Sequence, residues 1–138
     1  MDATGRNAGF VVRAGERYQG KQGPDYIPGI SAESVGAHAL WLGSVTIPPD
    51  GGRTKAHVHE SHESAFYLLS GAAVELYTGE DLENREVASA GDYLYVPAGV
   101  PHVAVNRGTV PAVFIGARTD PNEQESVVMR PELDEQVP

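Results

Sequence analysis

The sequence predicts an all-β domain, a sandwich or barrel built from short strands. The chain has 138 residues, the size of one domain, and 41% of them are hydrophobic, which is enough for one core. Its 16 glycines and 10 prolines are too many for a helical bundle and suit short strands joined by tight turns. Short segments with strand character follow one another at close spacing, which indicates a sandwich or a barrel.

The expected elements follow the chain in order. The first strand is expected at residues 9–13, and residues 19–36, rich in glycine, proline and serine, are expected to form a long loop. The next strand, 39–47, ends at a proline- and glycine-rich turn at 48–52. A polar turn is expected at 79–84. The remaining strands are expected where apolar residues alternate or cluster between turn residues, at 53–59, 64–70, 72–78, 93–96, 103–106 and 112–118.

We expect a single domain over residues 1–138, because the chain contains no repeat and no linker-like segment. Its parts are an N-terminal strand with loops at 1–38, a barrel core at 39–118 and an acidic tail at 119–138. The tail contains three prolines, so we expect an irregular segment that lies on the barrel. Residues 127–129 are expected to add to the edge of a sheet.

Charge and composition narrow the range of partners and ligands. The net charge of −9 repels phosphate backbones and anionic lipids, so we expect neither a nucleic-acid nor a membrane partner. No apolar run approaches the roughly 18 residues that span a bilayer, and the N-terminus lacks the apolar core of a signal peptide, so a cytoplasmic location is expected. The chain has no cysteine, so any metal must be bound by nitrogen and oxygen ligands.

The histidines are the first candidate ligands. His57 and His59 lie two residues apart, so on a strand both side chains project from the same face, and His62 follows closely. Imidazole is a favoured ligand of zinc, copper, iron and nickel. A polar strand edge that faces solvent is the alternative interpretation of this cluster. His38 lies in a different stretch and is not expected to be a ligand.

A second spacing pattern surrounds His102. Gly91 is followed by five residues, then by Pro97-Ala98-Gly99, two residues, His102, three residues and Asn106. This order and spacing resemble the second motif of the cupin superfamily at every position. The first cupin motif is similar to the stretch in which five residues separate Gly51 from the pair His57-x-His59, and which ends at Gly71.

The resemblance covers residues 51–106 directly. It implies a double-stranded β-helix, which is a jelly-roll barrel. It also implies one divalent metal ion in the mouth of the barrel, with His57, His59 and His102 as ligands.

The first motif departs from the family at the position of its carboxylate. Counting back from Gly71 places Ser64 there, whereas counting forward from His59 selects Glu63. If position 64 faces the cavity, strand alternation turns His62 inward and Glu63 outward. We therefore favour His62 as the fourth metal ligand. Glu63 stays the alternative, because a bulge in the turn would shift the alternation.

A site of four neutral imidazoles leaves the ion its full charge, which suits a Lewis acid. Zinc is the favoured ion, with nickel, manganese and iron as alternatives. Residues 57–71 and 119–124 resemble small bacterial single-domain cupins, some of which are similar to zinc cupins that cyclise aromatic polyketides. The resemblance implies a metal-dependent cyclase or isomerase with a small, carbonyl-rich substrate. A metal-dependent dioxygenase and a non-catalytic binding protein are the alternatives.

Other pocket residues are predicted from strand alternation. Lys55 shares the parity of His57, so it is expected either to project toward the cavity or to be solvated at the strand end. Together with a metal-activated water, Lys55 and Ser64 are the candidate catalytic groups. Trp41 and Phe66 are expected to line the substrate pocket or to belong to the core. A homodimer formed through edge strands is the expected assembly.

Overall fold

The computed structural model describes residues 8–13, 18–19, 23–123 and 126–138. Its strands and its short helix run through the chain in the following order: β1 (Tyr18–Gln19), β2 (Asp25–Ile30), α1 (Ala32–Val35), β3 (Trp41–Ile47), β4 (Gly52–Arg53), β5 (His57–Val58), β6 (Ser64–Ser70), β7 (Val74–Thr78), β8 (Asn84–Ala88), β9 (Tyr93–Val96), β10 (His102–Asn106), β11 (Ala112–Arg118) and β12 (Val128–Met129). A 3-10 helix, Pro131–Gln136, follows near the C-terminus.

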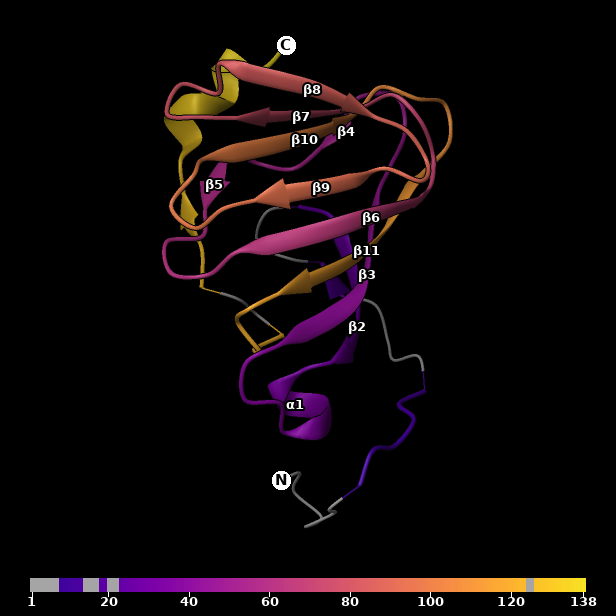
Figure 1. Ribbon diagram of the computed structural model, residues 1–138. Coiled ribbons are helices and arrows are strands. Elements are labelled where there is room, and N and C mark those ends of the chain that lie inside the picture. Colours follow the sequence, from indigo (N-terminus) through magenta and orange to yellow (C-terminus); the bar gives the residue numbers. More distant parts are fainter. Residues whose placement is uncertain (1–7, 14–17, 20–22, 124–125) are drawn as a thin grey trace.

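The described strands form two antiparallel sheets (Figure 1). The first has the strand order β1-β2-β3-β11-β6-β9, and the second has the order β12-β5-β10-β7-β8, with β4 also paired to β10. Strands that are distant in sequence are therefore neighbours, as where β11 lies between β3 and β6. The all-β prediction is confirmed. No helix among the described residues is long and apolar enough to cross a membrane.

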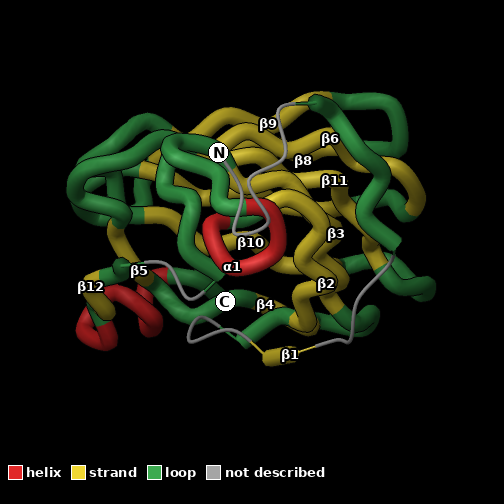
Figure 2. Tube along the Cα trace, turned by 90° about the horizontal axis from the view of Figure 1, so that it is seen from below, coloured by secondary structure: helices red, strands yellow, loops and turns green. Residues whose placement is uncertain are grey.

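The main core lies on the inner faces of the sheets. It contains alternate residues of the first sheet, such as Val45, Leu68 and Phe114, together with Val74 of the second sheet. A second cluster joins the C-terminal segment to the barrel, because Leu133 and Val137 pack with Tyr77, Val103 and Val105. β12 pairs with β5 close to the 3-10 helix, as predicted for residues 127–129 (Figure 2).

Most of the predicted strands are confirmed, and three match residue for residue: β6, β9 and β11. The predicted strand at 53–59 is divided into β4 and β5, because residues 54–56 leave strand geometry. β8 had not been predicted, and only its first residue, Asn84, falls in the turn expected at 79–84. Its first four residues are exposed, so the alternation that reveals a half-buried strand is absent there.

The N-terminal predictions are wrong in two places. Residues 9–13 are not part of a strand, and Val11 is 72% exposed, because a short apolar run becomes a strand only where it pairs with a neighbour. The predicted loop at 19–36 contains β2 and α1 instead. Pro28 suggested a loop, but it is part of β2. It lies beyond the two residues of β2 that pair with β1, and the pairing of β2 with β3 shifts register next to it, and such positions tolerate proline.

Helix α1 begins at a capping box in which Ser31 and Ser34 satisfy one another's backbone. The Ser31 side chain accepts a hydrogen bond from the Ser34 N–H, and the Ser34 hydroxyl accepts one from the Ser31 N–H. The helix ends at Gly36, whose φ is +73°. It lies below the strands in Figure 1 and is therefore near the viewer in Figure 2.

A charged cluster on the second sheet is expected to make stability depend on pH. The carboxylate of Glu75 accepts hydrogen bonds from Arg107 Nε (2.8 Å), Arg85 Nε (3.1 Å) and the Tyr77 hydroxyl (2.8 Å). The Arg107 hydrogen bond, aided by those of Arg85 and Tyr77, lowers the pKa of Glu75 to about 2. Because the folded pKa lies below the ordinary value of 4.5, this contribution is present above that value and is lost as the pH falls toward 2.

We expect Glu75→Gln to lower the free energy of unfolding at pH 7 by about 1–3 kcal/mol. The difference from the wild type should shrink as the pH falls below 4.5, because the wild type then loses the contribution that the variant lacks. Urea unfolding of both proteins at pH 7 and pH 4 measures both effects. An equal pH dependence in the two proteins would contradict this account.

Candidate metal centre

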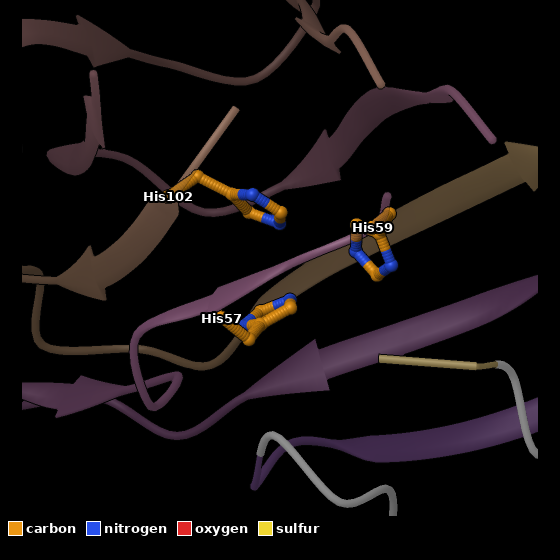
Figure 3. A group of neighbouring side chains, drawn as sticks. All are labelled: His57, His59 and His102. Carbon is orange, nitrogen blue, oxygen red and sulfur yellow. The ribbon is translucent and has the colours of Figure 1, made fainter. Parts of the chain in front are cut away.

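Three buried histidines meet at the mouth of the barrel. His57 lies in β5, His59 follows that strand, and His102 begins β10, where it stands opposite His57 in the register. Their exposed fractions are 2%, 3% and 6%. One ligand nitrogen from each ring lies within 4.8 Å of those from the other two. Figure 3 shows the three rings gathered around a common space.

The backbone fixes the orientation of two of these rings. The Nδ1–H of His57 donates to the carbonyl of Lys55 (2.6 Å), and the Nδ1–H of His102 donates to the carbonyl of Val100 (3.0 Å). A carbonyl can only accept, so each bond places the proton on Nδ1 and leaves the Nε2 lone pair available as a ligand. Neutral imidazoles in this tautomer fit a divalent cation, and the residues present therefore suit the metal that the sequence predicts.

A tight turn connects the two parts of this centre. Gly99 lies between β9 and β10, its φ is +79°, and its N–H donates to the carbonyl of His59 (2.8 Å). A Cβ added at Gly99 would meet no atom within 4 Å. A substitution there would therefore be disfavoured by the backbone conformation and not by a clash.

We expect Gly99→Val to weaken metal binding by about tenfold, because a β-branched residue at positive φ costs more than about 1–2 kcal/mol and shifts the turn before His102. Gly99→Asn is the matched control, because asparagine tolerates the left-handed conformation better. Titration of each purified protein with zinc measures the affinity. Unchanged affinity in the valine variant would refute the role given to this turn.

An apolar cavity adjoins the histidines. Its volume is about 60 Å³, counted as the space open to the centres of water molecules, which is room for a few waters or a small organic molecule. His57, His59 and His102 line it together with Ser64, Phe66 and Trp41. The residues predicted for the pocket, Trp41 and Phe66, thus lie in its wall, and so does Ser64.

Lys55 does not line this cavity, and its side chain is exposed, so the first of its two predicted placements is wrong. The reason is that residues 54–56 are not in a strand, so the alternation counted back from His57 does not extend to Lys55. His38 is also exposed.

The fourth-ligand prediction is only partly reflected in the geometry. His62 is buried and its ring lies beside that of His59, with a centroid separation of 4.6 Å, whereas Glu63 is exposed. The structure does not bring His62 into the group of three converging ligand atoms. Its Nδ1 instead lies 3.7 Å from a carboxylate oxygen of Asp120. The four-histidine site therefore stays a prediction.

We expect His62→Ala to weaken metal binding by about 10–100-fold, the range for residues that contact or orient ligands, whereas Glu63→Gln should have little effect. The reason is that His62 contacts a ligand ring and Glu63 points to solvent. Competition with a coloured chelator measures both variants under the same conditions. If Glu63→Gln lost the metal while His62→Ala kept it, Glu63 and not His62 would be the fourth ligand.

Arg118 is a pocket residue that the sequence analysis did not identify. It ends β11, it is 7% exposed, and it lines the cavity, where its guanidinium carbon lies 4.0 Å from the centroid of the Trp41 ring. The signal was present in the sequence. Positions 112, 114, 116 and 118 of this strand share one face, so a charged residue at the last of them points inward.

Comparisons with known proteins agree with this architecture. The family model described as a cupin domain matches residues 43–117. An uncharacterized protein of Methanocaldococcus jannaschii is 30% identical over 79 residues, which are 57% of this chain and 60% of that protein. The chain thus spans less than two thirds of the length of this relative.

Solved structures with a similar fold include two that illustrate the architecture. An uncharacterized conserved protein of Klebsiella pneumoniae with a double-stranded β-helix domain superposes with a TM-score of 0.64 and 19% identity, covering 81% of this chain and 88% of that one. Oxalate decarboxylase of Bacillus subtilis, described with Mn(II) centres, gives a TM-score of 0.68 and 21% identity, covering 83% of this chain and 30% of that one. Both similarities support a double-stranded β-helix.

Proposed function

Because the chain belongs to the cupin domain family, we propose that it is a metal-dependent enzyme that uses Lewis-acid and proton-transfer chemistry on a small carbonyl compound. The observation that supports this most strongly is the donor set. Three buried imidazoles converge, and two of them have their Nδ1 protons bound by backbone carbonyls. In this proposal His57, His59 and His102 hold one divalent ion, with His62 as a fourth ligand.

The group formed by His57, His59 and His102 contains no carboxylate among the residues that the structure describes, and this favours Lewis-acid chemistry. Facial triads of two histidines and one carboxylate are typical of iron oxygenases. Here Glu63 is exposed and the carboxylate of Asp120 lies beside His62, outside the group of three. When bound to neutral ligands only, a zinc ion supplies a Lewis acid that polarises a carbonyl oxygen and so favours enolisation.

The residues around the histidines have roles of their own in this proposal. Apolar side chains such as Ile47, Phe66 and Phe114 form most of the cavity wall, so a bound substrate would be separated from bulk water. The buried Ser64 hydroxyl lies in the same wall, where it can accept or donate a hydrogen bond. The backbone bonds of His57 and His102 hold their rings in one orientation, which would leave their Nε2 atoms free to bind the ion.

The substrate of the proposed enzyme is a small carbonyl-rich molecule, and cyclisation of an aromatic polyketide is the most specific form of the proposal. The small volume of the cavity suits one ring or a short chain, so a larger polyketide would have to extend beyond it. A dioxygenase and a non-catalytic binding protein are the competing outcomes of the test below.

Metal analysis and isotope exchange test the proposal. Protein purified without added metal should contain about one zinc per chain by elemental analysis. In D₂O the protein should catalyse exchange of the protons next to the carbonyl group of small ketones or 2-oxo acids, which NMR can monitor. It should do so without consuming oxygen. Iron or manganese together with oxygen uptake would favour the dioxygenase. Bound metal with neither reaction across the panel would favour the binding protein.

A further inference from the structure

The peptide group between Lys55 and Ala56 joins one of the three histidines to the C-terminal segment. Its carbonyl oxygen accepts the hydrogen bond from His57 Nδ1–H (2.6 Å), and its N–H donates to a carboxylate oxygen of Asp134 (2.8 Å). The C=O and the N–H of a trans peptide point in opposite directions, so the imidazole and the carboxylate lie on opposite sides of this group. A chain of hydrogen bonds therefore runs from the carboxylate through the peptide to the imidazole of His57.

Ala56 is bound by the C-terminal segment at both of its backbone groups. Its N–H donates to Asp134, and its carbonyl accepts a hydrogen bond from the Arg130 N–H (2.9 Å). Ala56 is fully buried, and residues 54–56 are not in a strand. The residue that directly precedes His57 is thus held in place by contacts from the other end of the chain.

The position of Asp134 is fixed by the packing of its own helix. It lies in the 3-10 helix Pro131–Gln136, whose buried Leu133 belongs to the second core cluster. The guanidinium of Arg53 donates to the carbonyls of Asp134 (3.2 Å) and Val137 (2.9 Å). One of its nitrogens also lies 3.7 Å from the carboxylate oxygen that accepts the peptide N–H. The carboxylate is therefore held against the peptide by the fold.

His102 makes the same local hydrogen bond as His57 but has no such link to a carboxylate. Its Nδ1–H donates to the carbonyl of Val100 (3.0 Å), which again lies two residues before the histidine. The next residue is Pro101, whose nitrogen carries no hydrogen, so no acceptor can bond to the other end of this peptide. Of these two histidines, only His57 is connected through a peptide to a carboxylate.

We propose that Asp134 is a positioning residue of the metal centre, which acts on His57 through the peptide between Lys55 and Ala56. A carboxylate that accepts the N–H bond polarises the peptide, so its carbonyl becomes a stronger acceptor. The stronger bond keeps the proton on Nδ1 and raises the basicity of Nε2, as a directly bonded carboxylate does for metal-binding histidines. This inference rests on the proposed function, whose metal site it extends to the C-terminal segment.

Zinc affinity of the full chain, measured by chelator competition, is the first test. Asp134→Ala should weaken zinc binding by about tenfold, the lower end of the range for residues that orient a ligand, because its effect passes through a peptide. Asp134→Asn should have an intermediate affinity, since its side-chain oxygen still accepts the bond but carries no charge. The Asp134 side chain is 34% exposed, so neither substitution leaves a buried cavity. Thermal unfolding verifies that each variant folds.

Glu132→Ala is the matched control. Glu132 lies in the same 3-10 helix, its side chain is 59% exposed, and its carboxylate accepts a hydrogen bond from Arg130 Nε (2.7 Å). The control therefore removes one negative charge and one arginine contact from the same helix but leaves the bond to the Ala56 N–H in place. Its zinc affinity should equal that of the wild type.

The tautomer of His57 supplies a second readout, which needs no metal. At pH 8, above the pKa of about 6.5 of an ordinary imidazole, the ring nitrogen chemical shifts of the metal-free protein report which nitrogen carries the proton. The signals of His57 are assigned by their absence from His57→Ala. Asp134→Ala should shift His57 toward the form protonated on Nε2 and leave His102 unchanged, because the peptide before Pro101 has no N–H. A general loosening of the protein would not distinguish the two rings.

Three results would overturn the inference: a zinc affinity of Asp134→Ala or Asp134→Asn equal to that of the wild type, an equal loss of affinity in Glu132→Ala, or an unchanged tautomer of His57 in Asp134→Ala. The proposed metal chemistry would survive each of them. Conversely, a wild type that binds no zinc would overturn the proposed function. The tautomer of His57 in the metal-free protein would then still decide whether Asp134 acts on this ring.

Discussion

Replacement of His102 by alanine is expected to lower zinc affinity by more than about 100-fold, the upper end of the range for residues that only orient a ligand. His102 is 6% exposed, its Nδ1–H is bound by the carbonyl of Val100, and its ring centroid lies 4.2 Å from that of His57. Alanine removes the ligand atom. The other proposed ligands, His57, His59 and His62, all come from one short segment and cannot replace a ligand that β10 supplies. His57→Ala should have an effect of similar size.

Two measurements check this prediction. Chelator competition gives the affinity, and thermal unfolding gives the stabilisation by metal. This stabilisation should be about 2.7 kcal/mol for the wild type at a zinc concentration of 100 Kd, and it should fall to about 0.4 kcal/mol or less in the variant at the same concentration. His38→Ala is the matched control, because His38 is exposed and lies outside the cluster. If His102→Ala binds zinc as the wild type does, the proposed centre is wrong.

Replacement of Asn106 by leucine should cost about 3–5 kcal/mol of folding free energy, because three backbone groups lose a hydrogen-bond partner, one in a buried bond and two in partly buried bonds that water can replace only in part. Asn106 is fully buried. Its amide donates to the carbonyls of Ile47 (3.1 Å) and Val110 (2.9 Å), and its side-chain oxygen accepts from the Gly108 N–H (2.9 Å). One side chain thus connects the ends of β3 and β10 to the turn before β11.

Urea unfolding at pH 7 measures this cost, and Asn84→Leu is the control, since Asn84 lies on the exposed face of β8. The control should change stability by less than about 0.5 kcal/mol. A loss below 1 kcal/mol in Asn106→Leu would show that the turn does not depend on these bonds. The role expected for Asn106, the last residue of the second motif, is therefore to stabilise the barrel and not to take part in the chemistry of the metal centre.

From the sequence alone, strand alternation predicted several strand ranges and the direction of the side chains near His62, and motif spacing indicated the histidine cluster. Where one face of a strand is buried, the alternation is strong, and β6, β9 and β11 match their predicted ranges. The same period-two rule places His62 and Ser64 inside and Glu63 outside. The resemblance of the two motifs to those of cupins implied that His57, His59 and His102 would meet, and the antiparallel pairing of β5 with β10 sets His57 opposite His102.

Tertiary structure decided the features that depend on neighbours in space. β8 has an exposed, nearly non-alternating sequence and is a strand only because β7 provides its hydrogen-bond partners, while the apolar run at 9–13 is not part of a strand. Lys55 faces solvent because residues 54–56, between β4 and β5, are not in a strand. Trp41 and Arg118 are 77 positions apart in the sequence, and they meet only because β11 pairs with β3. Local pattern determines which face of a strand a residue occupies, but the pairing of strands determines what that face meets.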